Sequence, residues 1–356
     1  MQPRFRIIAD RHDVTRAVAD RLIELIITDE AGLASDVVRL TLDDRRRADG
    51  AIAQLPRIGT QLEVALSYAG GAWVPMGRYI IDEVEISAPP ATLTVSGKAA
   101  DMVGPFRSPK TRSWHDTTLA RIVEAIAAEH GYTPKIDPEL GAIAIPHVDQ
   151  TEESDMALLT RLASKHDAVS KPVAGHLVLA KRGAAKSVTG QALPTITLRP
   201  DQISEWRYQY SARRIAGKGG PGLADNSGDE SHGGVKAYWW DYKKGERREV
   251  VVGNPPYEEL RYVHATEAEA RAAAATRKNR GERSRAELSF RMPGDPRLAA
   301  EARLSIALRP VIPTRWRITR VEHRLSAQGY STSVECERDV TDPISITQSE
   351  VNDDTP

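Results

Sequence analysis

Pro56-Arg57-Ile58-Gly59 leads into the alternating apolar run Leu62, Val64 and Leu66, then Arg78-Tyr79-Ile80-Ile81, Val84-Glu85, a polar turn, and Thr92-Leu93-Thr94-Val95 before Asp101. Near the other end, Pro296-Arg297-Leu298 leads into Leu304, Ile306 and Leu308, then Arg315-Trp316-Arg317-Ile318, Val321-Glu322, a turn at Gln328-Gly329, and Thr332-Ser333-Val334 before Asp339. Apolar residues at every second position are typical of half-buried strands. The elements follow in the same order near both ends. This order suggests one β module used twice, although amphipathic hairpins also resemble each other by coincidence.

Such a repeat bears on assembly, because internal repeats make symmetric rings easy to build. If three subunits close into a ring, two similar modules per subunit place six similar units around the axis. A ring of this kind can join a threefold partner to a sixfold one.

The charge balance argues against a chain-wide attraction to nucleic acid or to an anionic membrane, because Lys and Arg number 49 and Asp and Glu also number 49. At 356 residues the chain is longer than one hydrophobic core usually serves, so two or three domains are expected. Positive charge concentrates in one stretch, which is either a docking patch for an acidic partner or, as we favour, a solvated helix end. Its cations are Arg271, Arg277, Lys278, Arg280, Arg283, Arg285 and Arg291.

Cys336 is the only cysteine, so no intrachain disulfide can form, and folding in a reducing cytosol is expected. It alternates with Val334 and Arg338, which favours a small core residue over a nucleophile. Arg4 and Arg6 fall where a signal peptide needs a long apolar stretch, and no later segment approaches the length of a membrane span. We therefore expect a soluble protein without an export signal.

The pattern changes twice along the chain. Residues 1–104 indicate strands, which fit an antiparallel sheet curled into a barrel or sandwich. Residues 105–190 indicate a small α/β insert, with a helix from Leu119 closed by Gly131 as C-cap and a second helix after Ser154 as N-cap. Strands return over 191–347, with a mobile glycine-rich loop at 215–234 and an alanine-rich helix at 265–279. Residues 348–356 are expected to be a disordered tail.

Four blocks of sequence carry a resemblance to a known family. They are Ser113-Trp114-His115-Asp116-Thr117-Thr118-Leu119, Glu153-Ser154-Asp155-Met156-Ala157-Leu158-Leu159-Thr160-Arg161-Leu162-Ala163, Ala237-Tyr238-Trp239-Trp240-Asp241, and His323-Arg324-Leu325-Ser326-Ala327-Gln328-Gly329-Tyr330-Ser331-Thr332. Each block is short and degenerate, but their order and spacing together resemble the phage late control gene D proteins. The resemblance covers nearly the whole chain.

The resemblance implies an α+β, mainly β chain with two tube-like antiparallel β-barrel domains, 1–104 and 191–347, related by internal duplication and separated by the α/β insert. It implies a homotrimeric baseplate hub of a contractile phage tail or of a phage-derived injection particle such as a tailocin. The implied partners are the central spike, the tail tube or a tube-initiator protein, and the baseplate wedge and tape measure proteins. No specific nucleic acid and no stable membrane association are expected. The hub would be assembled in the bacterial host cytoplasm and lie in the tail baseplate.

No catalytic residue comes with this resemblance, and the sequence itself offers weak candidates. Glu152, Glu153 and Asp155 could serve as a glycosidase acid and base, but beside Ser154 they also fit the acidic first turn of a helix. The loop from Gly217 to Gly222 lacks the Lys-Ser or Lys-Thr of a phosphate-binding loop. We therefore expect no enzyme and no cofactor. The alternatives are a tail-associated peptidoglycan hydrolase and a cell-wall-binding protein that uses the 105–190 insert.

Histidines gather in the middle segment, which raises the question of a metal site. None are spaced i, i+4 as in a helical ligand pair, and no cysteine is nearby, so no metal is expected. Two of them fit helix C-termini, where a cation meets the helix dipole favourably: His130 and His166. The full set is His115, His130, His147, His166 and His176.

Aromatic residues concentrate in the third segment, as barrel core, as an interface or as a glycan platform. They are Trp206, Tyr208, Tyr210, Tyr238, Trp239, Trp240 and Tyr242. Adjacent residues of a strand point to opposite faces. At least one of Trp239 and Trp240 should therefore meet a neighbouring chain or domain, because large exposed aromatics tend to mark interfaces. We take these two residues as the candidate interface.

Overall fold

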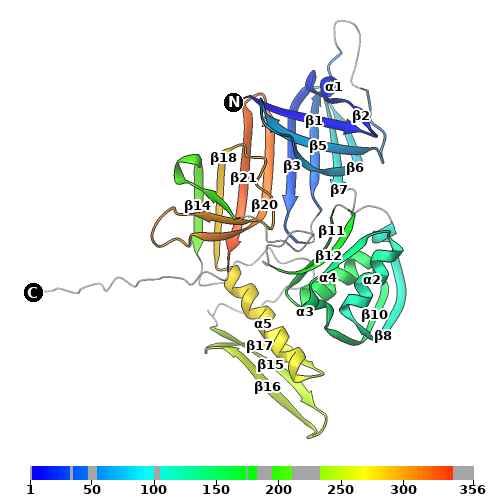
Figure 1. The fold of residues 1–356 in the computed structure, drawn as a ribbon, viewed down its shortest axis with the longest axis vertical. Coiled ribbons are helices and arrows are strands. Elements are labelled where there is room, and N and C mark those ends of the chain that lie inside the picture. Colours follow the sequence, from blue (N-terminus) through cyan, green and yellow to red (C-terminus); the bar gives the residue numbers. More distant parts are fainter. Residues whose placement is uncertain are drawn as a thin grey trace, which may run out of the picture.

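The computed structural model describes residues 2–32, 35–46, 54–99, 105–173, 175–182, 195–210 and 233–339. The chain is mainly β, and most of its strands belong to one 13-stranded sheet (Figure 1). An α/β region and a second, smaller sheet with a long helix lie beside it. The predicted tail 348–356 lies outside the described residues, as does the predicted loop 215–234 apart from residues 233 and 234.

The N-terminal half of the large sheet is built from six main strands. They are β1 (Pro3–Ala9), β3 (Leu22–Glu30), β4 (Val37–Asp43), β5 (Gln61–Tyr68), β6 (Val74–Ser87) and β7 (Thr92–Ala99). The short strand β2 (His12–Asp13) and helix α1 (Thr15–Ala19) follow β1. The main strands pair in the order β3-β4-β7-β6-β5-β1, all antiparallel.

The C-terminal half also has six strands. They are β13 (Ile196–Leu198), β14 (Glu205–Tyr210), β18 (Ala286–Pro293), β19 (Arg303–Ile306), β20 (Arg315–Ser326) and β21 (Gly329–Arg338), with a 3-10 turn, η3, at Pro200–Gln202. They pair in the order β14-β18-β21-β20-β19-β13. If the strands of each half are numbered along the chain, the two pairing orders are the same. One pairing differs in direction, because β13 runs parallel to β19 whereas β1 runs antiparallel to β5.

The two halves are joined because residues 320–326 of β20, beyond the segment that pairs with β19, pair antiparallel with β3 at the edge of the first half. The joined strands form an open path from β14 to β2, and the pairings of the described residues contain no closed ring. Each half has its own apolar core, and the core of the first half also takes in Leu325 and Tyr330 of the second. Tyr68 reinforces the contact: its hydroxyl donates to the Gly294 carbonyl at 2.7 Å, and its ring lies 5.8 Å from that of Tyr330.

The α/β region follows the sequence prediction closely at its helices. Helix α2 (Leu119–Glu129) buries the predicted apolar face and is followed by Gly131 in the left-handed region, at φ +71°. Helix α4 (Asp155–Lys165) begins after Ser154, whose hydroxyl accepts the N–H of Ala157. The other elements are η2 (Pro105–Arg107), β8 (Pro109–Thr118), β9 (Thr133–Ile136), α3 (Pro138–Gly141), β10 (Ala144–Ser154), β11 (Ala168–Val173) and β12 (His176–Lys181). They form the sheets β10-β8 and β11-β12-β9 around one apolar core.

The remaining strands form a lobe of their own. β15 (Gly234–Asp241), β16 (Glu246–Gly253) and β17 (Tyr257–His264) make a sheet in the order β16-β15-β17 that shares no described pairing with the large sheet. Helix α5 (Glu267–Arg283) runs along one face and extends four residues beyond the predicted end. Ala270 and Ala274 are fully buried against Val235 and Ala237, so small side chains let this helix approach the sheet closely. No helix within the described ranges has the length and apolar character to cross a membrane.

Candidate functional site

The two tryptophans of the candidate interface lie on β15, in the lobe that projects from the rest of the molecule (Figure 1). Trp239 packs into the cluster under α5 together with Val252 and Leu260. Trp240 is 40% exposed. The two indole rings thus lie on opposite faces of the sheet, as the alternation of a strand requires.

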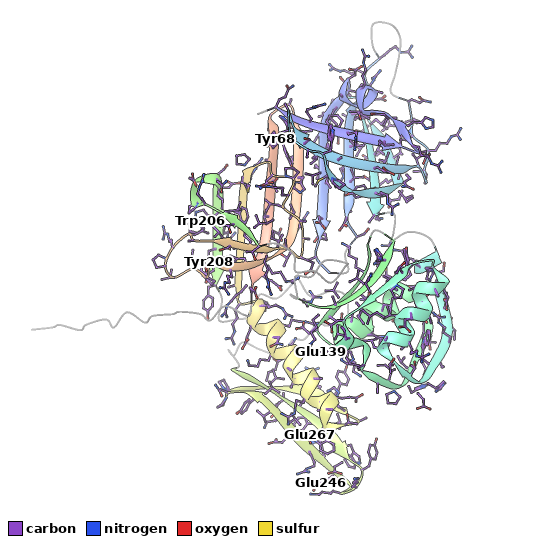
Figure 2. The ribbon with its side chains drawn as sticks, in the orientation of Figure 1. Tyr68, Glu139, Trp206, Tyr208, Glu246 and Glu267 are labelled. Atoms are coloured by element: carbon purple, nitrogen blue, oxygen red, sulfur yellow. The ribbon has the colours of Figure 1, made fainter. Side chains whose placement is uncertain are left out.

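The face opposite α5 carries aromatic and charged side chains together. The guanidinium of Arg247 stacks over the ring of Tyr238 at 4.3 Å from its centroid, and the Tyr238 hydroxyl donates to Glu259 at 2.9 Å. Tyr242 and Tyr262 of the same lobe are 77% and 79% exposed. Figure 2 shows Glu246 and Glu267 near the end of the lobe that lies away from the large sheet. This combination of exposed aromatic rings and fixed charges is typical of a protein-binding surface.

The other predicted aromatics lie far from this lobe, on the edge strand β14 (Figure 2). Tyr208 points inward, with its ring 6.0 Å from that of Trp316 and edge-on to it. Trp206 and Tyr210 lie on the same face of β14 as Tyr208, because they pair with the buried Phe290 and Ala286, but they are 39% and 44% exposed. A shallow depression of about 390 Å³ beside Trp206 is lined mainly by polar and charged side chains of β18, β20 and β21. The aromatic set of the sequence is therefore two separate groups on two sheets.

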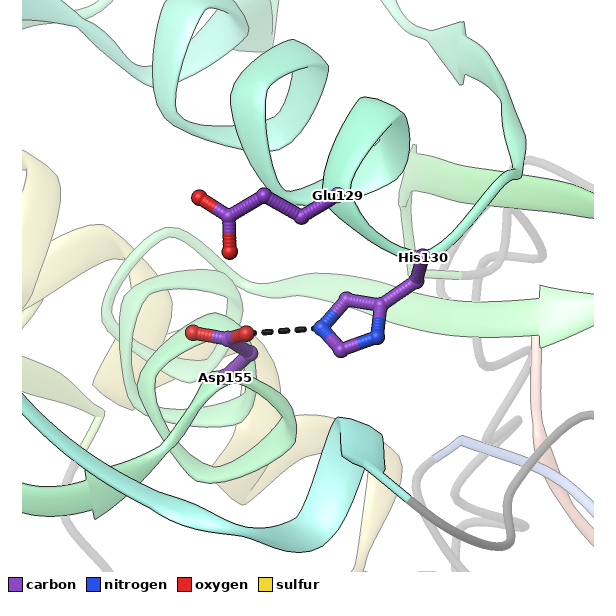
Figure 3. A group of neighbouring side chains, drawn as sticks. All are labelled: Glu129, His130 and Asp155. Carbon is purple, nitrogen blue, oxygen red and sulfur yellow. Dashed lines mark hydrogen bonds and ion pairs between the residues drawn. The ribbon is translucent and has the colours of Figure 1, made fainter.

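Figure 3 shows Glu129, His130 and Asp155, which meet between α2 and α4. Asp155 is completely buried. One of its carboxylate oxygens accepts from Arg112 at 2.7 Å and from the Gln150 amide at 2.9 Å. The other accepts from Lys110 at 2.6 Å and lies 2.7 Å from His130 Nε2.

Glu129 completes this network, since its two oxygens accept from Arg112 at 2.5 Å and from Lys110 at 2.7 Å. All four carboxylate oxygens are therefore already bound by donors, and two of the donors are cations. A metal ion would have to displace both cations, so these residues do not fit a metal site. Burial acts to raise the pKa of Asp155, but hydrogen bonds from His130, Lys110 and Gln150 outweigh it and hold the pKa at about 2.

The same geometry bears on the glycosidase interpretation. A glycosidase needs one carboxyl group that stays protonated through a raised pKa. Asp155 has a lowered pKa, and Glu153 forms an ion pair with Arg161 at 2.6 Å. Glu152 sits in the left-handed region at φ +46°, in the irregular stretch of β10. These three carboxylates do not supply the required acid and base. The interpretation of Asp155 as a first-turn residue of a helix is confirmed, although the sequence did not predict its burial.

The histidines separate into different environments. His130 and His166 cap the C-termini of α2 and α4, as predicted. The predicted cationic role is wrong for His166, because burial, with a contribution from Lys165, lowers its pKa and keeps the ring neutral near pH 7. His115 and His147 face each other across the pair β8–β10. Sequence reasoning missed this pair because it searched for helical spacing, and a predicted strand register would have found it.

The basic stretch of α5 is largely neutralised within the chain. Arg283 is buried and forms a two-pronged ion pair with Asp167 at the end of α4, with one contact at 2.8 Å. Arg277 pairs with Glu258 at 2.6 Å, and Lys278 pairs with Glu282 at 2.6 Å. The stretch is therefore mainly a structural joint between α5 and its neighbours. Cys336 is buried, as predicted, and burial raises the pKa of its thiol.

Solved structures show which class of fold this is. The 43 kDa tail protein of prophage MuSo2 from Shewanella oneidensis matches with a TM-score of 0.69 at 16% identity, over 96% of this chain and all of that one. An Escherichia coli protein, c3393, described as a component of the type VI secretion system similar to tail proteins gp27 and gp5 of bacteriophage T4, matches with a TM-score of 0.54 at 13% identity, over 89% of this chain and 73% of that one. The fold is that of a phage tail protein.

Sequence comparison then gives the family. The chain belongs to the phage tail baseplate hub (GPD) family, whose model matches residues 34–329. It is 29% identical over 387 residues to the probable baseplate hub protein of Escherichia phage 186, with 96% of this chain and 94% of that protein covered. It is 28% identical over 386 residues to that of Escherichia phage P2, with 96% and 95% covered. The protein is a structural baseplate hub, as the resemblance to the late control gene D proteins predicts.

Proposed function

We propose that three copies of this hub close into a ring that presents six similar β units around its axis and joins the tail tube to the central spike. The observation that supports this proposal is the strand order of the large sheet, in which both halves pair their six strands in the same sequence. Two similar units per copy allow a threefold assembly to offer a near-sixfold surface to the tube. The other face of the ring would then grip the threefold spike.

In this proposal the two halves are products of an internal duplication. Residues 1–104 and 191–347 supply the tube-like barrel domains, and residues 105–190 form an insert domain between them. Edge strand β14 pairs only with β18 among the described residues, and an edge of this kind favours further pairing. A neighbouring copy would cover it when the ring closes. The barrels would then be completed by assembly.

The proposed partners are the spike, the tail tube or a tube-initiator protein, and the wedge and tape measure proteins. The likeness to a secretion-system component that resembles tail proteins supports a spike-side contact. The balanced charge supports the absence of a specific nucleic-acid partner and of a membrane-bound state. The hub would act through geometry and not as an enzyme, in a tail baseplate assembled in the host cytoplasm.

We also infer that the exposed face around Trp240 contacts another chain of the baseplate. Trp240 and Tyr242 would be anchors of that contact, because large aromatic side chains contribute most when a partner removes them from water. Trp239 would support the face from behind, as part of the core under α5.

The test of the ring is the mass of the assembly. Native mass spectrometry of the full chain, alone and mixed with the central spike protein of the same particle, should show three hub copies in at least the mixture. A hub that stays monomeric in the presence of the spike would contradict the proposal.

A further inference from the structure

A pair of histidines projects outward from the two-stranded sheet β8–β10. His147 lies directly opposite His115 in the strand register. Their Nδ1 atoms are 3.1 Å apart, and the ring centroids are 4.6 Å apart. Trp114 and Val148, the neighbouring cross-strand pair, face the apolar core instead, so both imidazole rings lie on the exposed side of the sheet.

The ring of His147 is held in a defined orientation. Its Nε2 lies 3.1 Å from a carboxylate oxygen of Asp149, and the other oxygen of Asp149 accepts from the Ser113 hydroxyl at 2.6 Å. The carboxylate of Asp149 is thus in hydrogen-bond contact with both neighbours, one through each oxygen. An ionised carboxylate only accepts, so the proton of neutral His147 is on Nε2 and the lone pair is on Nδ1, facing His115.

This arrangement is the one found around metal-binding histidines, which donate one ring N–H to a carboxylate and present the other nitrogen to the ion. We propose that His115 and His147 bind a divalent transition-metal ion, with Zn²⁺ as the representative, through their two Nδ1 atoms. Nitrogens 3.1 Å apart can both lie about 2.0–2.1 Å from one ion, with an N–Zn–N angle of about 100°. Water would complete the coordination on the exposed side.

Proton balance is simple in this site. Without the ion, the Nδ1–H of neutral His115 donates to Nδ1 of His147. When the ion binds, the proton on Nδ1 of His115 moves to Nε2 of the same ring. Both imidazoles therefore stay neutral, and no proton is released. Asp149 stays an acceptor throughout and acts as a positioning residue. The ion would add a further link between β8 and β10, beside their backbone pairing and side-chain hydrogen bonds such as that of Ser113 with Asp149.

The proposed site contrasts with the cluster around Asp155. There Lys110 and Arg112 already occupy the carboxylate oxygens. Here the two Nδ1 atoms have each other as hydrogen-bond partners, and an ion would replace that single hydrogen bond. The proposal departs from the sequence expectation of no metal, because that expectation considered helical spacing and these residues are brought together by strand pairing. It is independent of the proposed ring.

The test is isothermal titration calorimetry of the full chain with ZnCl₂. MgCl₂ is the negative control, because imidazole ligands select transition-metal ions over Mg²⁺. We expect one Zn²⁺ per chain whose affinity falls at least about 100-fold in His115→Ala and in His147→Ala, since losing a ligand should cost at least as much as losing an outer partner. His12→Ala removes another exposed histidine and serves as the matched control, with unchanged affinity expected. Zn²⁺ binding of equal affinity in wild type and in either pair variant would overturn the proposal.

Asp149→Asn tests the orientation separately, and its affinity should fall about 10–100-fold. An unchanged affinity would remove Asp149 from the site. Circular dichroism of each variant shows that it is folded. The ¹⁵N chemical shifts of the His115 and His147 rings provide a second readout, because the Nδ1 signals should move on Zn²⁺ addition, and Nδ1 signals that do not move would also overturn the proposal.

Discussion

Asp155 contributes to stability only because it is surrounded by donors. Its pKa of about 2 lies below the ordinary value near 4, so the folded state favours the charged form. By linkage this contributes about 2 kcal/mol at pH 7, and the contribution is lost as the pH falls from about 4 through about 2. The carboxylate also compensates Lys110 and Arg112, which are themselves partly buried.

Asp155→Asn should therefore lower the free energy of unfolding by about 2–4 kcal/mol at pH 7, because two cations lose their counter-ion. Urea denaturation followed by circular dichroism measures the change, and the difference from wild type should shrink as the pH approaches 2. Glu153→Gln is the matched control two residues earlier, at the end of β10, where a partly exposed ion pair with Arg161 should be worth less than about 1 kcal/mol. An equal loss of unfolding free energy in the two variants would contradict a larger contribution from the network around Asp155.

The pKa of Asp29 is shifted in the opposite direction to that of Asp155. Burial, with repulsion from nearby Asp36, raises the pKa of Asp29 to about 6, while Lys171 acts against the shift. The folded state thus favours protonated Asp29, and this contribution is present below pH 4 and is lost as the pH rises through about 6. Its carboxylate still accepts the N–H of Ala300 at 2.8 Å, a bond that an amide oxygen can also accept.

Asp29→Asn should raise the free energy of unfolding by about 1–3 kcal/mol at pH 8 and have little effect at pH 4. Thermal unfolding at the two pH values measures this. Asp36→Asn is the contrasting variant, because Asp36 pairs with Lys171 at 2.7 Å and its loss should destabilise the protein. A stability loss in Asp29→Asn that is the same at both pH values would contradict the assignment.

At the scale of elements, the lobe of β15, β16, β17 and α5 places two adjacent tryptophans in different environments. Trp239 packs in the core under α5, whereas Trp240 is exposed on the opposite face. Trp239→Ala should lower the free energy of unfolding by about 1–3 kcal/mol, because a half-buried ring leaves the core under α5. Trp240→Ala should change it by less than about 0.5 kcal/mol, as exposed sites usually do. Chemical denaturation measures both.

Incorporation of the same two variants into assembled particles gives the second half of this test. Trp240→Ala should reduce incorporation while leaving the fold intact. Normal incorporation of a folded Trp240→Ala hub would contradict the proposed contact. A loss of stability in Trp240→Ala equal to that in Trp239→Ala would contradict the assignment of the two faces.

The sequence predicts elements where a local rule decides the conformation. Ser154 as N-cap and Gly131 at positive φ mark helix ends through backbone chemistry that acts within a few residues, and both are confirmed. Pro172 lies within β11, and the chain turns at Gly175, at φ +79°. A proline fixes its own φ without deciding between a strand edge and a turn.

Pairing between distant strands lies beyond such rules. The sequence predicts strands over 191–347, but it cannot tell that β15 joins a small sheet under α5 and not the large one. The same limit hid the buried network of Asp155, whose donors Lys110 and Arg112 lie on β8, more than forty positions earlier in the chain. It also hid the pairing of His115 with His147.

At the scale of the whole molecule, charged side chains hold the parts together. Arg317 is buried in the large sheet and binds Glu301 and Glu337. Glu337 also contacts Arg283 of α5 at 3.3 Å, and Arg283 binds Asp167 of the α/β region. One connected network thus links the large sheet, the helix of the small lobe and the α/β region.

The central claim is that the two halves of the large sheet are equivalent units of a ring. A cryo-electron microscopy reconstruction of the hub bound to its spike tests it most directly. The account predicts a threefold ring in which the β1 to β7 half and the β13 to β21 half alternate around the axis at similar radius, giving six similar units. A ring in which only one half of each chain surrounds the axis, or an assembly with no threefold symmetry, would contradict it.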